Sequence, residues 1–168
     1  VRIGAGDGEG GEETLRRAAS GYAVPAEALF EIGNHFLDME RADEAIPYFK
    51  RALAVRPDYS WCANNLGNAY RAANRLEDAR ESYQLAISAD ADNPNPHNGL
   101  GVLREAKGDL PGALASYRAA AQVDESYMDA RYNAGVVLLK LGRAREALAE
   151  LEAARKLRPD YATTYYQL

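Results

Sequence analysis

Cysteine and β-branched residues are scarce in this sequence of 168 residues. The single cysteine, Cys62, excludes an internal disulfide framework and a cysteine-based zinc site. Valine and isoleucine together number 11, against 32 alanines. Because alanine is the strongest helix former and β-branched residues favour strands, this bias predicts an all-helical chain.

Long apolar runs and an excess of basic charge are also missing. The longest apolar run, Ala134 to Leu139, is far too short to span a bilayer. Hydrophobic residues still make up 47% of the chain and charged residues 27%, which is typical of a folded protein. Twenty basic and 25 acidic residues give a net charge of −5. Because nucleic-acid binding needs a basic face, we expect neither nucleic acid nor an acidic partner.

The sequence carries no pattern typical of an enzyme or a metal site. His35 and His97 lie far apart with no ligand set near either, so we predict no metal site. The glycines of Gly6-x-Gly8-x-x-Gly11 formally match a dinucleotide fingerprint, but no strand–helix unit surrounds them. We interpret that segment as a linker and predict neither a cofactor nor catalytic activity.

Glycine, in contrast, is periodic. Four glycines recur at intervals of 34 residues: Gly33, Gly67, Gly101 and Gly135. The same interval relates three further sets, which are Ala45, Ala79, Ala113 and Ala147, then Phe49, Tyr83, Tyr117 and Leu151, and finally Ala52, Ala86, Ala120 and Ala154. Each unit has two apolar patterns with helical spacing, separated by a short polar turn. We expect the small residues to lie where two helices approach closely, with the aromatic ring filling the space beside them.

The period and its motifs resemble the tetratricopeptide repeat (TPR) family. Leu66 to Tyr70 read Leu-Gly-x2-Tyr, and Ala45 to Phe49 read Ala-x3-Phe. The resemblance implies an all-α fold, a right-handed α-solenoid of antiparallel helix pairs. Two helices of roughly 13 residues cannot bury a core alone, whereas stacked pairs bury a continuous one.

The period divides the chain into repeats. We expect four full repeats at residues 26–59, 60–93, 94–127 and 128–161, and the truncated start of a fifth at 162–168. Residues 1–25 are interpreted as a glycine-rich linker and an orphan capping helix, and docking of that helix on a neighbouring molecule is the alternative. Because the chain begins with Val1 rather than Met, we expect it to be a piece of a longer protein.

The third repeat departs most from the pattern. Pro94, Pro96 and Gly99 crowd its first helix, and Arg104 replaces an aromatic residue. The prolines are tolerated in a first helical turn, but a glycine inside a helix costs about 1 kcal/mol relative to alanine. We therefore predict that this repeat is the softest point of the array.

The resemblance also implies where a partner binds. In TPR arrays the first helices of the repeats line a concave groove that binds extended peptides or helices. The resemblance assigns twelve positions to this groove: Phe30, Asn34, Trp61, Asn64, Asn65, Asn68, Arg71, Asn98, Val102, Tyr132, Asn133 and Val136. The charged groove positions are five acids (Glu27, Glu31, Asp38, Glu105 and Asp129) and two bases (Arg71 and Lys140). This balance favours a neutral or basic partner.

One TPR subfamily, the heat-shock co-chaperones, binds a C-terminal carboxylate with basic residues and two asparagines. Asn34 and Asn65 match those asparagines, but Phe30, Asn95 and Gly99 stand where the basic residues should be. Without those charges an acidic tail gains no charge-assisted hydrogen bonds, so this interpretation fails.

A second pattern, the asparagine ladder of O-GlcNAc transferases, fits better. Asn65 and Asn133 occupy equivalent groove positions, and an amide offers a donor and an acceptor to a peptide backbone. The apolar anchors in this interpretation are Trp61, Phe30 and Tyr132. Two alternatives stay open: asparagines of a repeat can cap turns or bind water, and Trp61 can pack between neighbouring units.

We therefore predict a protein-interaction scaffold that binds an extended peptide or a helix in the groove, with a protein or peptide as partner and no membrane. One alternative is the substrate-recruiting arm of a larger enzyme such as a glycosyltransferase. Another is a self-assembling scaffold whose repeat ends associate. The sequence does not fix the compartment, and the cytoplasm is our working assumption.

Overall fold

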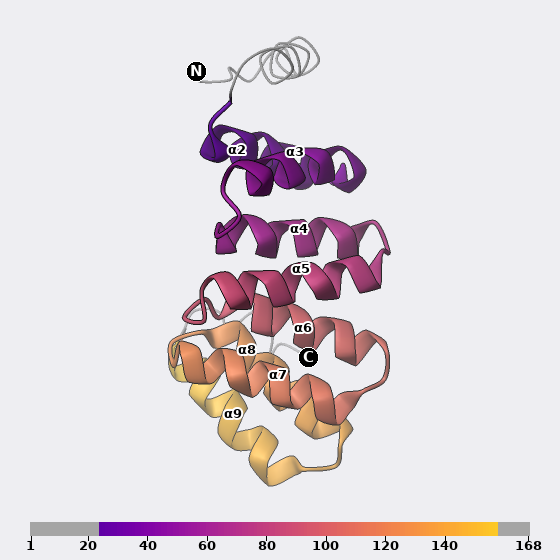
Figure 1. Cartoon of the computed structure of the whole chain (residues 1–168). Helices are drawn as coiled ribbons and strands as arrows, with labels where there is room; N and C mark the ends of the chain where they lie inside the picture. The colour runs from indigo at the N-terminus through magenta and orange to yellow at the C-terminus, as the bar shows by residue number, and fades with distance from the viewer. Residues whose placement is uncertain (1–23, 158–168) are drawn as a thin grey trace.

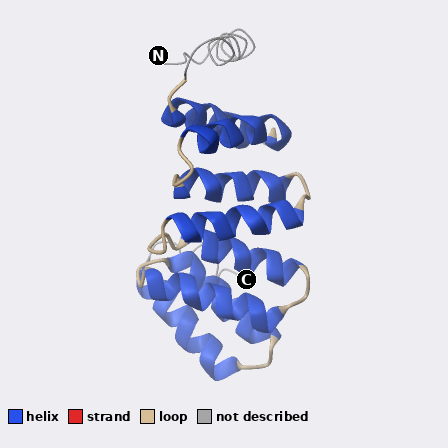
Figure 2. Ribbon diagram, viewed as in Figure 1, coloured by secondary structure: helices blue, strands red, loops and turns tan. Residues whose placement is uncertain are grey.

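The computed structural model describes residues 24–157, which contain eight α-helices and no strand (Figure 2). In chain order the helices are α2 (Ala26–Asp38), α3 (Ala42–Val55), α4 (Ser60–Ala72), α5 (Leu76–Ala89), α6 (Asn95–Ala106), α7 (Leu110–Val123), α8 (Met128–Lys140) and α9 (Ala144–Leu157). This confirms the all-helical prediction. The expected capping helix and the truncated fifth repeat lie outside the described residues.

The helices pack as pairs that stack along one axis, from α2 and α3 at one end to α8 and α9 at the other (Figure 1). The second helices begin at Ala42, Leu76, Leu110 and Ala144, each 34 residues after the previous one. Each first helix also contacts the first helix of the next pair, α2 with α4, α4 with α6, and α6 with α8. The first helices therefore form one continuous row.

The periodic glycines lie where the two helices of a pair approach most closely. A Cβ atom on Gly33 would lie 2.6 Å from Cε1 of Phe49, and one on Gly67 would lie 2.6 Å from Cε1 of Tyr83. Both rings are fully buried. The predicted packing of small residues against an aromatic ring is confirmed, since any side chain at these glycines would overlap the ring.

The turn after each first helix also repeats. Its residues have positive φ angles, which are 60° at Glu40, 58° at Asn74, 79° at Gly108 and 74° at Gly142. Only glycine adopts this left-handed conformation without steric cost. The first two helix pairs therefore hold a side chain in a strained turn, whereas the last two pairs do not.

The structure corrects our interpretation of Gly99. A Cβ atom there would lie 2.6 Å from Cε1 and Cζ of Tyr83, so the missing side chain lets α6 pack against this ring of α5. Pro96 lies in the first turn of α6, as predicted, whereas Pro94 stands just before the helix at its N-cap. Arg104, at the position of the missing aromatic, donates hydrogen bonds to the carbonyl oxygen of Gly112 at 3.1 Å and to Oγ of Ser116 at 2.7 Å.

The buried apolar residues of the described part form two clusters. One extends from α2 to α5 and includes Leu103 of α6, and the other joins residues of α7, α8 and α9. The boundary between them falls within the third helix pair. Its softness remains a prediction.

Candidate functional site

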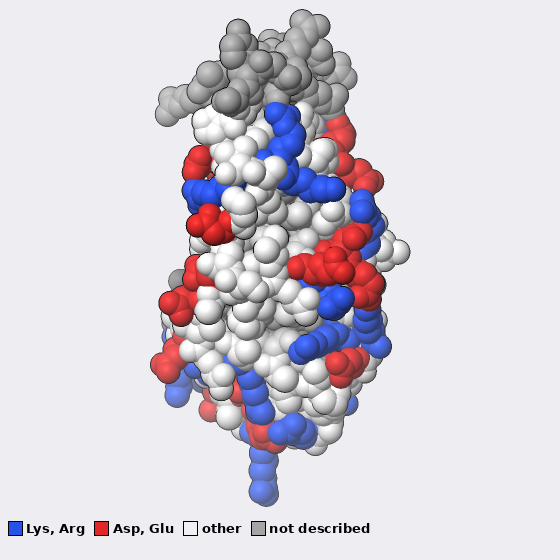
Figure 3. Space-filling model, in the orientation of Figure 1, with Lys and Arg blue, Asp and Glu red and all other residues white. Residues whose placement is uncertain are grey.

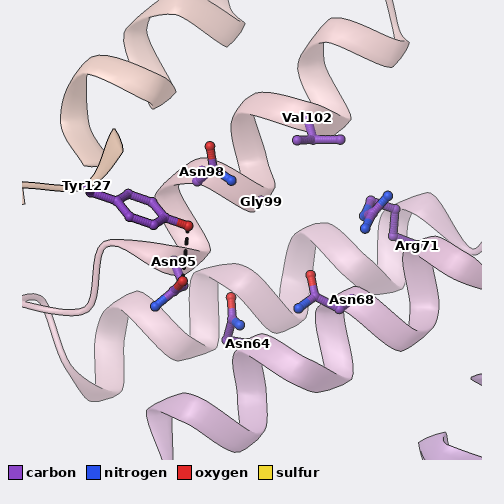
Figure 4. A pocket seen from close by; sticks show the side chains of 8 residues that line it. All are labelled: Asn64, Asn68, Arg71, Asn95, Asn98, Gly99, Val102 and Tyr127. Atoms are coloured by element: carbon purple, nitrogen blue, oxygen red, sulfur yellow. Dashed lines mark hydrogen bonds between the residues drawn. The ribbon is translucent and has the colours of Figure 1, made fainter. Parts of the chain in front are cut away.

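A polar pocket opens between α4 and α6, two neighbouring first helices. It has a volume of about 100 Å³ and is lined by Asn64, Asn68, Arg71, Asn95, Asn98, Gly99, Val102 and Tyr127 (Figure 4). The side chains from α4 follow each other at spacings of four and three residues, so they lie on one face of the helix. Five of the twelve predicted groove residues come together here: Asn64, Asn68, Arg71, Asn98 and Val102.

Two pairs of asparagines form hydrogen bonds, one pair on each side of the pocket. Nδ2 of Asn65 donates to Oδ1 of Asn34 at 2.8 Å, which joins α4 to α2. Nδ2 of Asn133 donates to Oδ1 of Asn98 at 3.0 Å, which joins α8 to α6. The two residues that we expected to contact a peptide therefore form amide bridges between consecutive helix pairs.

The corresponding bridge between α4 and α6 does not exist. The residue 34 positions after Asn65 is Gly99, which has no side chain that could reach α4. The ring of Tyr83 occupies the space beside Gly99. Its Oη donates to Oδ1 of Asn68 at 2.7 Å. Burial raises the pKa of Tyr83, although the nearby charge of Arg71 partly offsets this, so the hydroxyl keeps its proton. The pocket thus lies at the junction of the first-helix row where no amide bridge is formed.

A hydrogen-bond network holds the opposite wall of the pocket. Oη of Tyr127 donates to Oδ1 of Asn95 at 3.1 Å (Figure 4). Nδ2 of Asn95 donates to Oδ1 of Asn93 at 3.0 Å, and Nδ2 of Asn93 donates to Oγ of Ser60 at 2.9 Å. Burial raises the pKa of Tyr127 to about 12, so this hydroxyl also remains a donor. The network fixes the amide of Asn95 in one orientation.

Sequence reasoning missed Tyr127. The available signal was Tyr59, which lies two repeat lengths earlier and stands just before a first helix in the same way. The ring of Tyr59 packs against Phe30, with 5.0 Å between the ring centroids. At the next junction this position holds Asn93, which is smaller and points to Ser60.

Two of the predicted groove acids are neutralised by their neighbours. Oε1 of Glu27 pairs with Nη1 of Arg56 at 2.6 Å, and Oε1 of Glu105 pairs with Nζ of Lys140 at 2.6 Å. Burial alone raises the pKa of Glu105, but its hydrogen bonds from Lys140 and Tyr117 outweigh this and lower it. Lysines and arginines also lie among the acids over the face shown in Figure 3.

Arg71 is the one charged residue that lines the pocket. Within residues 24–157 no ion pair to its guanidinium is found, and its side chain is exposed. Of the five predicted groove acids, the three that have no ion pair within the described part belong to the outer first helices α2 and α8: Glu31, Asp38 and Asp129. The row is therefore acidic towards its ends and basic at the pocket.

The predicted apolar anchors differ in their surroundings. Phe30 packs against Phe49 and Tyr59, at centroid distances of 6.0 and 5.0 Å, so it helps to join the first two helix pairs. Trp61 is 52% exposed on α4, which argues against packing between units. Tyr132 and Val136 of α8 are half-buried and do not line the pocket.

Between residues 24 and 157, no group of three or more histidine, cysteine or acidic side chains is placed to hold a metal ion. Burial raises the pKa of the Cys62 thiol to about 12, so it is a poor nucleophile. In the same range, no helix is both long and apolar enough to cross a membrane.

Comparison with known proteins decides the family. Models described as tetratricopeptide repeat match residues 24–92 and 129–161, and a model described as TPR repeat matches residues 103–142. The chain belongs to the TPR family. As a TPR protein it has the architecture of a protein-interaction scaffold, and such repeat proteins are typically not catalytic. A search of curated protein sequences found no match.

Solved structures share the TPR fold. A crystal structure of MamA superposes with a TM-score of 0.80 at 17% identity, over 97% of this chain and 99% of that one. MamA from Desulfovibrio magneticus RS-1, residues 41 to the end, gives 0.76 at 15% identity over 92% and 87%. TTC0263, a thermophilic TPR protein of Thermus thermophilus, gives 0.75 at 23% identity over 90% and 84%. At these identities the likeness shows the fold alone.

Proposed function

We propose that this TPR chain binds an extended segment of another protein along the row of first helices α2, α4, α6 and α8. The observation that carries the proposal is the amide-lined pocket between α4 and α6, together with a half-exposed tryptophan, Trp61, on the same helix α4. Amide side chains offer donors and acceptors to peptide groups without reading the side chains of the segment. The proposed partner is therefore an extended protein segment whose backbone peptide groups are recognised.

Trp61 is the proposed apolar anchor. It lies three residues before Asn64 and seven before Asn68, so all three share one face of α4. Large aromatic side chains beside a polar cleft contribute much of the binding energy in protein interfaces. An apolar side chain of the segment would cover Trp61 while the backbone passes the pocket.

The charges of the row favour neutral or basic residues at the ends of the segment. Glu31 and Asp38 lie on α2 and Asp129 lies on α8, and no ion pair to any of them is found within residues 24–157. Basic residues placed near them would gain modest Coulomb energy. The salt dependence of binding should therefore be small but measurable.

Selection from a random displayed peptide library tests the proposal, with the complete 168-residue chain as bait. The tightest peptide is then titrated against the chain and against Trp61→Ala. We expect the variant to weaken binding about tenfold, because truncation of an interface tryptophan costs roughly 1–2 kcal/mol.

The matched control is Leu148→Ala. Leu148 is a comparably exposed apolar residue, at 59%, but it lies on the second helix α9. Its truncation should leave the affinity unchanged. Failure to select any peptide, or an equal loss in both variants, would contradict binding along the first helices.

A further inference from the structure

The pocket between α4 and α6 presents more donors than acceptors. Oδ1 of Asn68 is engaged by the hydroxyl of Tyr83, and Oδ1 of Asn98 is engaged by Nδ2 of Asn133. These two hydrogen bonds use only the oxygens of the amides. Within residues 24–157, Nδ2 of Asn68 and Nδ2 of Asn98 have no hydrogen-bond partner. Each keeps two N–H groups for a ligand.

These nitrogens are open to solvent. No buried side-chain nitrogen or oxygen in the described part of the chain lacks a hydrogen-bond partner. The unpartnered nitrogens of Asn68 and Asn98 are consequently accessible, and both residues line the pocket (Figure 4). A ligand can reach them without any rearrangement of the helices.

Positive charge is added by Arg71. Its guanidinium lies beside the hydroxyl of Tyr83, on which its charge acts, and it points into the pocket from α4 (Figure 4). No carboxylate lines the pocket, and the acid one turn beyond Val102, Glu105, is already paired with Lys140. Arg71 therefore has no acidic neighbour in the pocket that would cancel its charge.

We propose that this pocket is a subsite for the side-chain carboxylate of an aspartate or glutamate in the bound segment. A carboxylate is an acceptor-only group whose two oxygens suit two amide donors and a guanidinium. Oδ1 of Asn64, whose nitrogen is used by Asn65, remains as an acceptor for a backbone N–H of the same segment. The inference rests on the proposed function, because it names one residue class of the segment.

An internal side chain fits better than a chain end. The row of first helices continues on both sides of the pocket, with α2 before α4 and α8 after α6. A segment that lies along the row therefore passes the pocket instead of ending there. The expectation of a neutral or basic partner came from the net charge and from the excess of acids among the groove positions, whereas the charged residue that lines the pocket is Arg71.

Two capped peptide libraries test the subsite. Both are acetylated at the N-terminus, amidated at the C-terminus and free of acidic residues, except that one has a central aspartate where the other has asparagine. We expect the aspartate library to bind about tenfold more tightly, since hydrogen bonds to charged groups are the stronger ones. Equal binding would overturn the subsite while leaving the proposed function intact.

The charge of Arg71 is tested by Arg71→Gln, with Arg80→Gln as the matched control. Arg80 is an arginine of α5 that pairs with Glu77 and does not line the pocket. The preference for aspartate should vanish in the first variant and persist in the second. Retention of the preference in Arg71→Gln would overturn the role of the guanidinium.

A small carboxylate tests the subsite without requiring a whole peptide segment to bind. Sodium acetate, titrated in place of sodium chloride at constant ionic strength, should shift the side-chain amide signals of Asn68 and Asn98 in a saturable way. Acetamide should not, because it carries no charge. If neither library binds but acetate does, the subsite stands and the proposed function fails; absence of saturable acetate shifts overturns the subsite.

Discussion

The junction between the second and third helix pairs differs from its two neighbours in how its first helices are joined. At the outer junctions, Asn65 reaches Asn34 and Asn133 reaches Asn98 across the row of first helices. At the middle junction Gly99 stands in the equivalent place, and a pocket opens between α4 and α6. The candidate binding site therefore lies at the junction that no asparagine bridge spans.

The comparison also explains why the deletion is tolerated. Tyr83 has a hydroxyl that Phe49, its counterpart in the first pair, lacks, and this hydroxyl takes over Asn68 as its partner. The amide oxygen of Asn68 is thus satisfied although the bridge is gone, so no buried polar group is left unpaired. Tyr83 therefore both packs against Gly99 and satisfies the amide oxygen of Asn68.

The largest effect is expected from restoring the repeat residue, in Gly99→Asn. The new Cβ would lie 2.6 Å from two atoms of the Tyr83 ring, so we expect destabilisation of about 1–3 kcal/mol from overpacking. Chemical denaturation measures it, with Ala106→Asn as the control at an exposed position of the same helix. An unchanged unfolding midpoint would show that α6 does not pack against Tyr83. Adding Tyr83→Leu, the residue type of the fourth pair, should recover part of the loss.

Removing the outer bridges should have a smaller effect. Asn65→Ala and Asn133→Ala each delete one hydrogen bond between helix pairs, so each should cost about 1 kcal/mol of unfolding free energy. The two losses should add, because the bridges lie at separate junctions. Gln122→Ala, at an exposed position of α7, is the control and should change little. If the free energy of unfolding is unchanged in both variants, the bridges do not stabilise the array.

The turns after the first helices provide a third comparison. Gly108→Ala places a side chain at a φ of 79° and should cost about 1 kcal/mol, whereas Glu40→Gly relieves a φ of 60° and should stabilise by up to about 1 kcal/mol. Thermal unfolding of both variants measures the two signs. Effects of the same sign would contradict the assignment of a left-handed turn to both positions.

The smallest effect concerns pH and the third helix pair. Burial lowers the pKa of His97 on α6, so the unfolded chain binds the proton more readily than the folded one. Stability should therefore fall as the pH drops from about 7.5 towards about 5.5, and His97→Gln should reduce that fall. His35→Gln, on α2 of the first pair, is the matched control in the same thermal unfolding series. If His97→Gln has the same pH dependence of stability as the original chain, titration of His97 does not contribute to that dependence.

The repeat itself could be predicted from the sequence because its signal is local. The 34-residue interval of the glycines places each one opposite an aromatic or aliphatic residue of the next helix, and the structure confirms this packing at Gly33 and Gly67. The position of the first-helix row was implied by the resemblance to the TPR family. Family membership then follows from the motif, as the matches over residues 24–92, 103–142 and 129–161 show.

The pocket could not be predicted because it depends on contacts between different repeats. Gly99 taken alone indicates a weakened helix, and its role becomes visible only beside Tyr83 of the previous pair. The groove charges were misleading for a similar reason. The count of groove charges treated Glu27 and Lys140 as unpaired. In the structure Glu27 pairs with Arg56, and Lys140 pairs with Glu105. Ion pairs between different helices depend on how the helices pack, which residue spacing in the sequence does not reveal.

Mapping a bound peptide by backbone amide shifts tests the central claim most directly. The peptide selected on the complete chain is added to isotope-labelled protein, and shifts are compared between the first helices and the second helices. The account predicts the largest shifts on α4 and α6 around Asn64, Asn68 and Asn98, with little change on α3, α5, α7 and α9. Shifts centred on the second helices would contradict it.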